Sequence, residues 1–119
     1  MISRAEIFSY VEENFGVTPD YPWARSPNSA ILRHRCSRKW FAAILDITQD
    51  KLGLDGDTLI DVLNLKCDPL LIGSLTKEPG IFPAYHMNKE HWVSIQLSSS
   101  IAAKSVYSLI DLSYELSKP

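Results

Sequence analysis

Three apolar, strand-like segments follow one another between residues 30 and 67, and this run constrains the fold more than any other feature. Polar and apolar side chains alternate over residues 30–36, residues 40–45 read WFAAIL, and residues 59–67 read LIDVLNLKC. A parallel pair of strands needs a long crossover connection, whereas short polar links suit antiparallel neighbours. The three segments therefore predict an antiparallel meander.

A helix before the meander is signalled at both of its ends. Ser3 and Glu6 form a capping box, in which each side chain bonds a free backbone N–H of the first turn. Ile2 and Ile7 occupy the two positions of a hydrophobic staple. Gly16 stands where a left-handed C-terminal cap belongs. The sequence therefore predicts a helix between Ser3 and Gly16.

A second, short helix is predicted directly after the third strand. Asp68 can cap the free N–H groups of a first turn, and proline suits the first helical position, which Pro69 would occupy. Leu70, Leu71 and Leu75 are expected to form the apolar side of this helix.

Two further strands and a last helix complete the chain. Strands are predicted at Tyr85–Met87 and His91–Leu97, on either side of a turn at Asn88 and Lys89. The last helix is predicted to begin near Ser99 or Ser100. The residues expected on its inward side are Val106, Leu109, Leu112 and Leu116.

The predicted order of elements is α-β-β-β-α-β-β-α. This order is typical of an α+β fold, here a two-layer α/β sandwich with helices covering one face of an antiparallel sheet. The chain has 119 residues and shows no internal repeat or linker, so residues 1–119 are expected to form a single domain.

The charge balance limits the nucleic-acid functions that the chain can have. The formal net charge is −2 and the sequence pI is about 5.9, whereas a dedicated nucleic-acid binder usually has a basic stripe or a pI above about 9. Contact with nucleic acid would therefore have to rest on a local basic patch.

Cysteine content and hydropathy predict the compartment. Cys36 and Cys67 follow no secretory signal, so free thiols in a reducing compartment are expected. No apolar run approaches the roughly 18 residues of a membrane span. The sequence thus predicts a soluble cytoplasmic protein without a membrane partner, and a monomer is favoured.

A basic cluster ends the first strand-like segment. Arg33, Arg35, Arg38 and Lys39 place four positive charges within seven residues. Alternation puts Arg33 and Arg35 on one face of the strand and His34 with Cys36 on the other. The cluster could contact phosphates, because arginine and lysine neutralise their charge and release counterions. The alternative is a solvated strand face and turn.

The segment around residues 64–69, NLKCDP, offers a second candidate. Lys66 precedes a helix N-terminus with free N–H groups, which is a plausible site for an anion. Alternatively, Asp68 fills that position itself and Cys67 is a small core residue. A nucleophilic Cys67 would need an electropositive, partly exposed setting and a partner base.

The third candidate is the segment YHMNKEHW at residues 85–92. His86 and His91 could bind a metal together with Cys67, but their spacing matches no zinc signature. Another interpretation is a hairpin whose turn touches a ligand while Tyr85 and Trp92 anchor it. The turn could also have no function. We expect no metal, no cofactor and no catalytic activity, since no catalytic motif is present.

Four strings give the sequence a family resemblance: GV with DYPW at residues 16–23, KWFAAI, KCDP and YHMNKEHW. With them the chain resembles the MmcQ/YjbR family of small bacterial proteins over nearly its whole length. The resemblance implies the element order given above, and DNA binding by a double-wing arrangement of hairpins. Its motif residues here are Tyr21, Pro22, Trp23, Lys66, Cys67, Asp68, Pro69, Tyr85, His86, Met87, Asn88, Lys89, His91 and Trp92.

Two functions are consistent with these observations. In the first, the protein binds DNA weakly or without sequence preference, through phosphate contacts from two hairpins and the sheet end between them. The residues expected to make these contacts are Arg33, Arg35, Arg38, Lys39, Lys66, Asn88 and Lys89. An acidic insert after Ile47 would weaken this hypothesis if it lay beside the same groove.

The second function is a module that binds a protein or a small anion without catalysis. Aromatic side chains would line a cleft in which Lys66 and His86 are the polar anchors. The aromatic residues expected there are Tyr21, Trp23, Tyr85 and Trp92.

Overall fold

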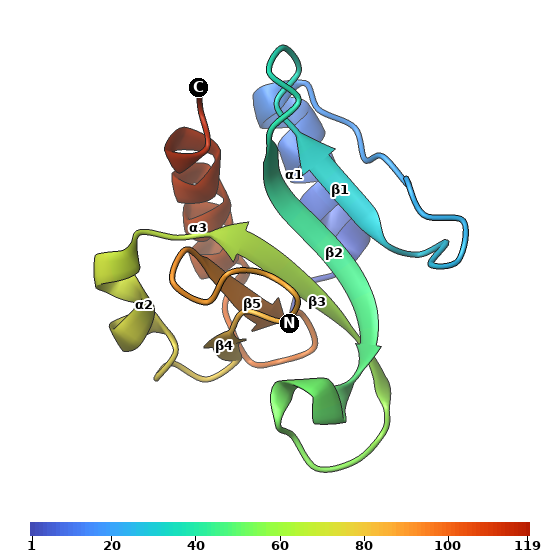
Figure 1. Cartoon of the computed structure of the whole chain (residues 1–119), viewed down its shortest axis with the longest axis vertical. Helices are drawn as coiled ribbons and strands as arrows, with labels where there is room; N and C mark the ends of the chain where they lie inside the picture. Colours follow the sequence, from blue (N-terminus) through green and yellow to red (C-terminus); the bar gives the residue numbers. More distant parts are fainter.

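The computed structural model describes all 119 residues and has the predicted order of elements (Figure 1). The elements are α1 (Arg4–Phe15), β1 (Ala30–Arg33), β2 (Trp40–Thr48), a 3₁₀ turn (Gln49–Leu52), β3 (Leu59–Lys66), α2 (Pro69–Leu75), β4 (Ile81–Pro83), β5 (Trp92–Gln96) and α3 (Ala103–Leu116).

The strands form one five-stranded sheet in the order β1-β2-β3-β5-β4, and each neighbouring pair is antiparallel. Helices α1 and α3 lie behind the same face of this sheet, while α2 lies to one side (Figure 1). The predicted α+β class, with a helical layer on an antiparallel sheet, is confirmed. The opposite face carries no helix and is crossed only by loops.

Both ends of α1 are capped as the sequence predicts. The Ser3 hydroxyl accepts a hydrogen bond from the Glu6 backbone N–H at 3.2 Å. Gly16 has φ 65°, and its N–H donates to the Glu12 carbonyl at 3.0 Å. Ile2 and Ile7 are both buried in the core, as a hydrophobic staple requires.

Stacked aromatic rings join α1 to α3. Phe15 stacks on Tyr114 with 3.9 Å between ring centroids, and Tyr10 stacks on Tyr107 at 4.1 Å. Phe41 of β2 meets both Phe15 and Tyr114 edge to face. Each such pair adds about 0.5–1.5 kcal/mol beyond the area it buries. The rings therefore hold the two helices against each other and against the sheet.

Strand β2 contains a bulge at Phe41. Arg33 lies opposite Trp40 and Leu32 lies opposite Ala42, so Phe41 has no partner in β1. Phe41 and Ala42 consequently both belong to the core beneath the helices, whereas Trp40 lines the other face of the sheet. An extra residue of this kind breaks the alternation of side chains along a strand.

Beside this bulge, the hydroxyl of Ser113 in α3 bonds backbone groups of β2 and β3. It accepts a hydrogen bond from the Lys66 N–H at 2.8 Å and donates to the Phe41 carbonyl. One turn further on, the Ser117 hydroxyl lies 2.8 Å from Nε2 of the buried His34. Ser113 thus satisfies two backbone groups at the end of the β2–β3 ladder, Ser117 at the C-cap of α3 bonds the His34 side chain, and no buried side-chain polar atom is left unpaired.

The strand predicted at Tyr85–Met87 is wrong, because the edge strand is β4 at residues 81–83. Ile81 is buried opposite Ile95 of β5. The Tyr85 N–H bonds the Ser94 side chain, and His86 has φ 61°, which no regular strand accommodates. The aromatic composition of residues 85–87 therefore belongs to a loop packed on the sheet.

The exposed sides of α2 and α3 also differ from the prediction. Leu70 is 88% exposed and Leu71 43% exposed, while Ile72 and Leu75 pack against the core. Leu116 of α3 is likewise exposed, and that helix begins at Ala103, three or four residues later than expected. A helix as short as α2 touches the sheet with one edge only, so it cannot bury three leucines.

The first strand ends three residues earlier than the alternation suggested. The chain turns between His34 and Lys39, whose backbone groups are joined by a 2.9 Å hydrogen bond. Cys36 lies in this turn and is exposed, whereas His34 is buried. His34 and Cys36 therefore do not share the strand face that the alternation predicts, and that prediction is wrong.

Replacing Ser113 by alanine tests the bond at the bulge. Ser113→Ala leaves the Lys66 N–H and the Phe41 carbonyl buried without a partner, which should lower the free energy of unfolding by roughly 1–3 kcal/mol or more. Urea unfolding measures the loss, and Ser108→Ala, on the exposed side of the same helix, is the control. Equal urea midpoints for the two variants would contradict this role.

Burial of His34 predicts that the protein loses stability in mild acid. Desolvation lowers the pKa of its imidazole below the ordinary value of 6.5. The unfolded chain then binds a proton more readily than the folded one, so stability is full above pH 6.5 and falls as the pH drops below it. In a His34→Leu variant this part of the pH dependence should vanish. Urea midpoints between pH 5 and 8 measure it, and parallel curves would refute the assignment.

Candidate functional site

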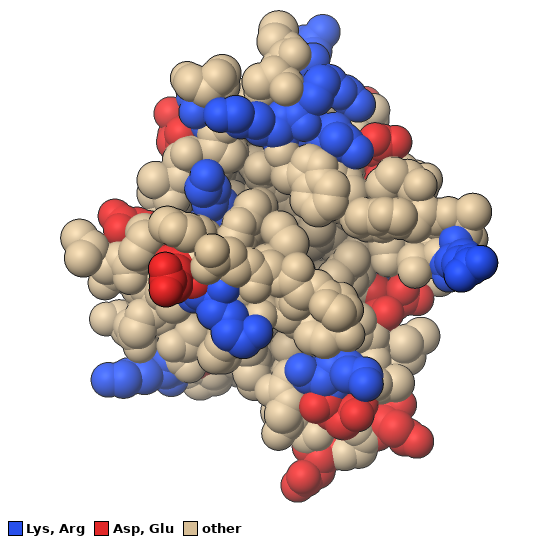
Figure 2. Space-filling model, in the orientation of Figure 1, with Lys and Arg blue, Asp and Glu red and all other residues tan.

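A cleft of about 470 Å³ opens on the face of the sheet that the helices leave uncovered. Figure 2 shows this face, with uncharged residues over its middle. Residues from β2, β3 and two loops surround the cleft. They are Trp23, Ser26, Ser29, Trp40, Ala43, Leu45, Asp46, Ile47, Asn64, Tyr85, His86 and Met87.

The loop before β1 forms one side of the cleft. Asp20 pairs with Ile31 through two backbone hydrogen bonds of 3.0 and 2.8 Å, which fixes the loop to the sheet edge. Trp23 then meets Trp40 edge to face at 5.8 Å between centroids. The guanidinium carbon of Arg33 lies 5.6 Å from the centre of the Trp40 ring, within cation–π distance.

A buried hydrogen-bond network fixes the loop on the other side. Asn64 of β3 donates to the Tyr85 carbonyl at 3.0 Å, and its own carbonyl oxygen accepts from the Ser94 hydroxyl. Ser94 in turn accepts from the Tyr85 N–H at 2.9 Å. Asn64 and Ser94 are fully buried. Both backbone groups of Tyr85 are thereby held in place above the sheet.

His86 follows Tyr85 in a left-handed backbone conformation, with φ 61°. Its exposed ring lies 4.0 Å from the Tyr85 ring. Histidine adopts this conformation more often than most residues, but at some cost in free energy. The neighbouring bonds of Tyr85 offset that cost and keep the His86 ring at the edge of the cleft.

Asn88 and Lys89, which the sequence places at a ligand-contacting turn, both bond within their own loop. The Asn88 side chain accepts from the Glu90 N–H at 2.8 Å, and its carbonyl accepts from the Trp92 N–H at 2.9 Å. The Lys89 ammonium donates to the Ala84 carbonyl at 2.9 Å. Both residues are exposed, but because all these bonds lie within the loop, their first role is to close it.

The four basic residues of the first cluster lie together at the turn between β1 and β2. Arg35, Arg38 and Lys39 are exposed, while Arg33 is partly buried. Asp20 lies 3.2 Å from Arg33 and 3.8 Å from Arg38. Together these groups carry more positive than negative charge.

The arginines also line a small polar pocket of about 240 Å³. Its other walls come from the chain that leaves α1. The lining residues are Gly16, Val17, Thr18, Asp20, Arg33, Arg35 and Arg38. All three arginines therefore contribute to one concave surface.

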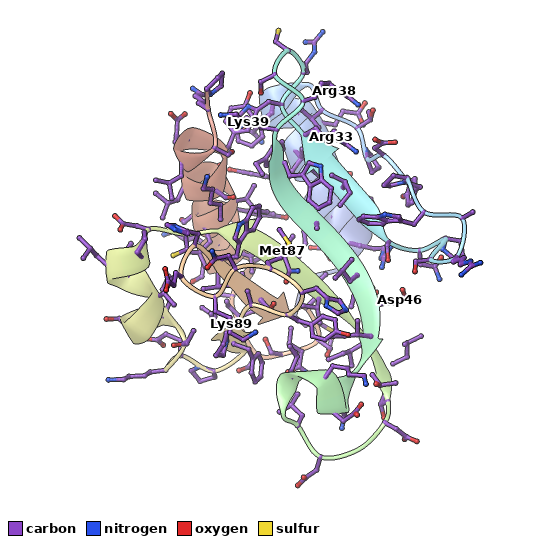
Figure 3. All side chains as sticks on the ribbon, viewed as in Figure 1. Arg33, Arg38, Lys39, Asp46, Met87 and Lys89 are labelled. Carbon is purple, nitrogen blue, oxygen red and sulfur yellow. The ribbon has the colours of Figure 1, made fainter.

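The two basic regions lie on one face of the molecule. Figure 3 shows Arg38 and Lys39 at one end of this face and Lys89 lower down. The acidic insert follows β2, so it lies at the opposite end of that strand from the basic turn (Figures 1 and 2). It therefore does not lie beside the arginines.

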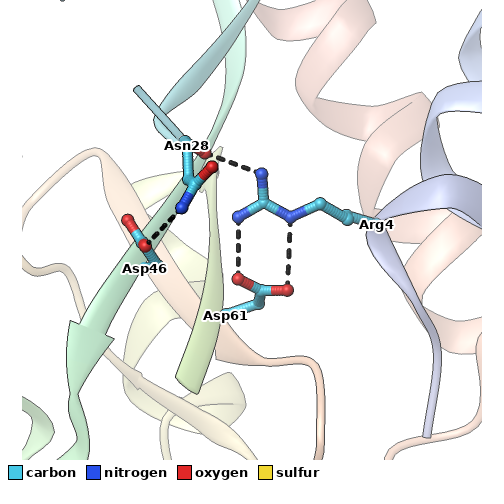
Figure 4. A network of polar contacts seen from close by, with 4 residues as sticks. All are labelled: Arg4, Asn28, Asp46 and Asp61. Atoms are coloured by element: carbon cyan, nitrogen blue, oxygen red, sulfur yellow. Dashed lines mark hydrogen bonds and ion pairs between the residues drawn. The ribbon is translucent and has the colours of Figure 1, made fainter. Parts of the chain in front are cut away.

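An ion-pair network borders the end of the cleft at which Asp46 lies (Figure 4). Arg4 of α1 binds both carboxylate oxygens of Asp61, at 2.7 and 3.2 Å, and donates to the Asn28 carbonyl at 2.6 Å. Asn28 donates to Asp46 at 3.2 Å. Arg4 thus joins α1 to β3 and to the loop before β1, and Asn28 links this network to the Asp46 carboxylate, which lines the cleft.

The KCDP segment turns the chain from β3 into α2. Asp68 accepts from the Leu70 N–H at 2.9 Å, so it fills the helix N-cap itself. Cys67 is buried, and desolvation followed by the charge of Asp68 raises the pKa of its thiol. Lys66 lies opposite Trp92 in the sheet. The structural interpretation of Asp68 and Cys67 is confirmed.

The metal alternative for His86, His91 and Cys67 has no geometric support. No three histidine, cysteine, aspartate or glutamate side chains form a group that could hold a metal ion. None of the helices has both the length and the apolarity to cross a membrane.

The structure brings together part of the aromatic cleft that the sequence suggests. Trp23, Tyr85 and His86 line it, but Tyr21, Trp92 and Lys66 do not. Trp40 is the residue that sequence reasoning missed. The bulge reverses its orientation, and no pattern in WFAAIL reveals this. By contrast, the apolar positions 43, 45 and 47 form a strand face that alternation could have found.

The fold and cleft define a class of small α+β domains in which two loops cross the open face of the sheet. Comparison with known proteins identifies the family. The family model described as YjbR matches residues 13–116, and the chain belongs to the YjbR family.

Two bacterial proteins are similar to the chain over nearly its whole length. The chain is 46% identical over 118 residues to the uncharacterized protein YyaQ of Bacillus subtilis (strain 168), covering 99% of this chain and 100% of YyaQ. A crystal structure of a Pseudomonas syringae protein superposes with a TM-score of 0.96 and 43% identity, over 98% of this chain and 100% of that one.

A more distant structure shares the fold. Deinococcus radiodurans protein DR2400 superposes with a TM-score of 0.73 at 22% identity, over 98% of this chain and 78% of that one.

The loop clamp at Asn64 can be tested by hydrogen exchange. Asn64→Ala removes the donor to the Tyr85 carbonyl and a partner of Ser94, so amides of residues 84–91 should exchange faster. Amides of residues 20–29, whose contacts are unchanged, serve as the internal control. Uniform acceleration over the whole chain would show a global loss of stability instead of a local clamp.

Proposed function

We propose that this YjbR-family domain is a DNA-binding module whose phosphate contacts come from the turn between β1 and β2. The supporting observation is the concentration of three exposed cations, Arg35, Arg38 and Lys39, on one projecting turn. Phosphate contacts of this kind fix a protein on DNA and release counterions. The DNA binding implied by the family resemblance agrees with this choice.

The geometry assigns different weights to the residues considered from the sequence. Arg33 is tied to Asp20 and Trp40, so it supports the turn more than it reaches outward. Lys89 can add charge from the same face, although its ammonium already bonds Ala84. Asn88 and Lys66 are secondary because their observed contacts serve the loop and the sheet.

The salt dependence of DNA binding tests the proposal. A triple variant, Arg35→Gln with Arg38→Asn and Lys39→Gln, removes the exposed cations and leaves Arg33 in place. Asparagine suits position 38 because Arg38 has φ 64°, a left-handed conformation that asparagine adopts more readily than most residues. Each lost contact should reduce the magnitude of the log–log salt slope by about 0.9 on duplex DNA, and therefore by 2 to 3 in the triple variant.

A matched control removes the same amount of charge elsewhere. Lys51, Lys77 and Lys104 are exposed and lie outside the turn, and each can be changed to glutamine. Fluorescence anisotropy with a labelled duplex, at several salt concentrations, gives the slopes. If the control triple lowers the slope as much as the turn triple, diffuse charge explains binding and the assigned turn is wrong.

A second candidate is a module that binds a small aromatic molecule in the cleft. The cleft favours it, because about 470 Å³ falls within the range of 300–1,000 Å³ that is usual for small-molecule sites. Seven of the twelve lining residues are hydrophobic, which also suits such a site. Affinity for a small ligand that responds neither to salt nor to the turn triple would favour this candidate over DNA.

A further inference from the structure

We propose that the cleft receives one unpaired base of a single-stranded nucleic acid while the basic turn holds phosphates of the same strand a few nucleotides away. This inference rests on the proposed function and names the form of nucleic acid that this face selects. It assigns a role to Trp23, Trp40, Tyr85 and His86, which phosphate binding alone does not use.

The cleft has aromatic groups on two sides. Trp23 and Trp40 form one pair near the β1 edge of the sheet, while Tyr85 and His86 come from the loop above β3 and β5. Trp23 is 38% exposed and His86 is also exposed, so both rings are open to a ligand. A base that enters between the pairs can stack on aromatic faces whatever its sequence, because every base has a π-face.

Both sides of the cleft are already fixed before a ligand binds. The Asp20–Ile31 bridge holds the first loop, and the Asn64–Ser94 network holds Tyr85. The Arg4 network holds Asn28 at the lower border. A site that is ordered in advance loses less conformational entropy on binding.

Charged groups at the two ends of the cleft can orient a nucleic-acid strand. Arg33 lies opposite Trp40, and Ala43 in the cleft floor follows three residues later in β2. At about 3.3 Å per residue the basic turn begins roughly 10 Å from this floor, which stacked DNA spans with about three nucleotides at 3.4 Å each. The Asp46 carboxylate at the other end repels phosphate, so the backbone is directed toward the arginines.

The recessed position of the cleft selects against paired bases. A base in a duplex is stacked and hydrogen-bonded to its partner, so it must leave the helix before it can enter a pocket. Bases of a single strand are already available and can be splayed onto aromatic side chains. The same surface therefore prefers single strands over duplexes of equal length.

Three labelled probes of twelve nucleotides separate base recognition from charge: an unstructured single strand, its duplex, and a strand of abasic sugar-phosphates. The single strand should bind at least tenfold more tightly than the abasic strand, which has the same phosphates without bases. Quenching of tryptophan fluorescence should accompany only the binding of base-containing single strands.

Matched variants locate the base. Trp23→Ala and His86→Gly each remove one exposed ring, and glycine suits the left-handed backbone at position 86. Each should weaken single-strand binding by about 5- to 150-fold, the effect of losing one base–aromatic stack. Tyr21→Ala removes an exposed ring of the same loop that does not line the cleft, so its affinity should equal that of the wild type.

The outcomes distinguish this inference from the proposed function. Equal affinity for the abasic and base-containing strands, with a normal salt slope, would overturn the role of the cleft and leave phosphate binding intact. Failure of all three probes to bind at low salt would overturn both. Preference for the duplex, unaffected by Trp23→Ala and His86→Gly, would also reject the single-strand assignment.

Discussion

The hydroxyl of Ser113 bonds β2 and β3 where their ladder ends, beside the bulge at Phe41, and the packing on both faces of the sheet depends on this region. The bulge at Phe41 would otherwise leave backbone groups of two central strands buried without partners. With them satisfied, Phe41 can enter the aromatic contacts between α1 and α3, and Trp40 can turn to the opposite face. One buried serine thus couples the packing of the helical layer to the aromatic lining of the cleft.

Local signals in the sequence were sufficient for the elements whose stability is mainly local. Ser3, Glu6 and Gly16 define α1 because caps act within one turn, and Asp68 with Pro69 defines the start of α2 in the same way. The edge strand was misplaced for the opposite reason. Residues 81–83 pair with β5, and such pairing across the sheet leaves no local signal in the sequence. Residues 85–87 resemble a strand in composition, but the backbone groups of Tyr85 bond the side chains of Asn64 and Ser94.

The candidate site could be predicted only in part, because it is assembled from segments far apart in the sequence. Trp23, Tyr85 and His86 stood out by their residue types, and the structure does place them around one cleft. Tyr21 and Trp92 are aromatic as well, but they do not line the cleft, because their orientations depend on loop and strand geometry. Trp40 was missed because alternation assumes an unbroken strand, and a bulge at Phe41 changes the side to which its neighbour points.

Net charge is a poor guide to what the basic turn can bind. The acidic insert and the turn lie at opposite ends of β2, a strand of nine residues that extends over about 30 Å at 3.3 Å per residue. At physiological ionic strength the Debye length is about 8 Å, so exposed charges this far apart are largely screened from each other. A phosphate near Arg38 therefore responds to the local cluster and to Asp20. The total of −2, which alone argues against a nucleic-acid partner, averages over charges that such a ligand would not experience together.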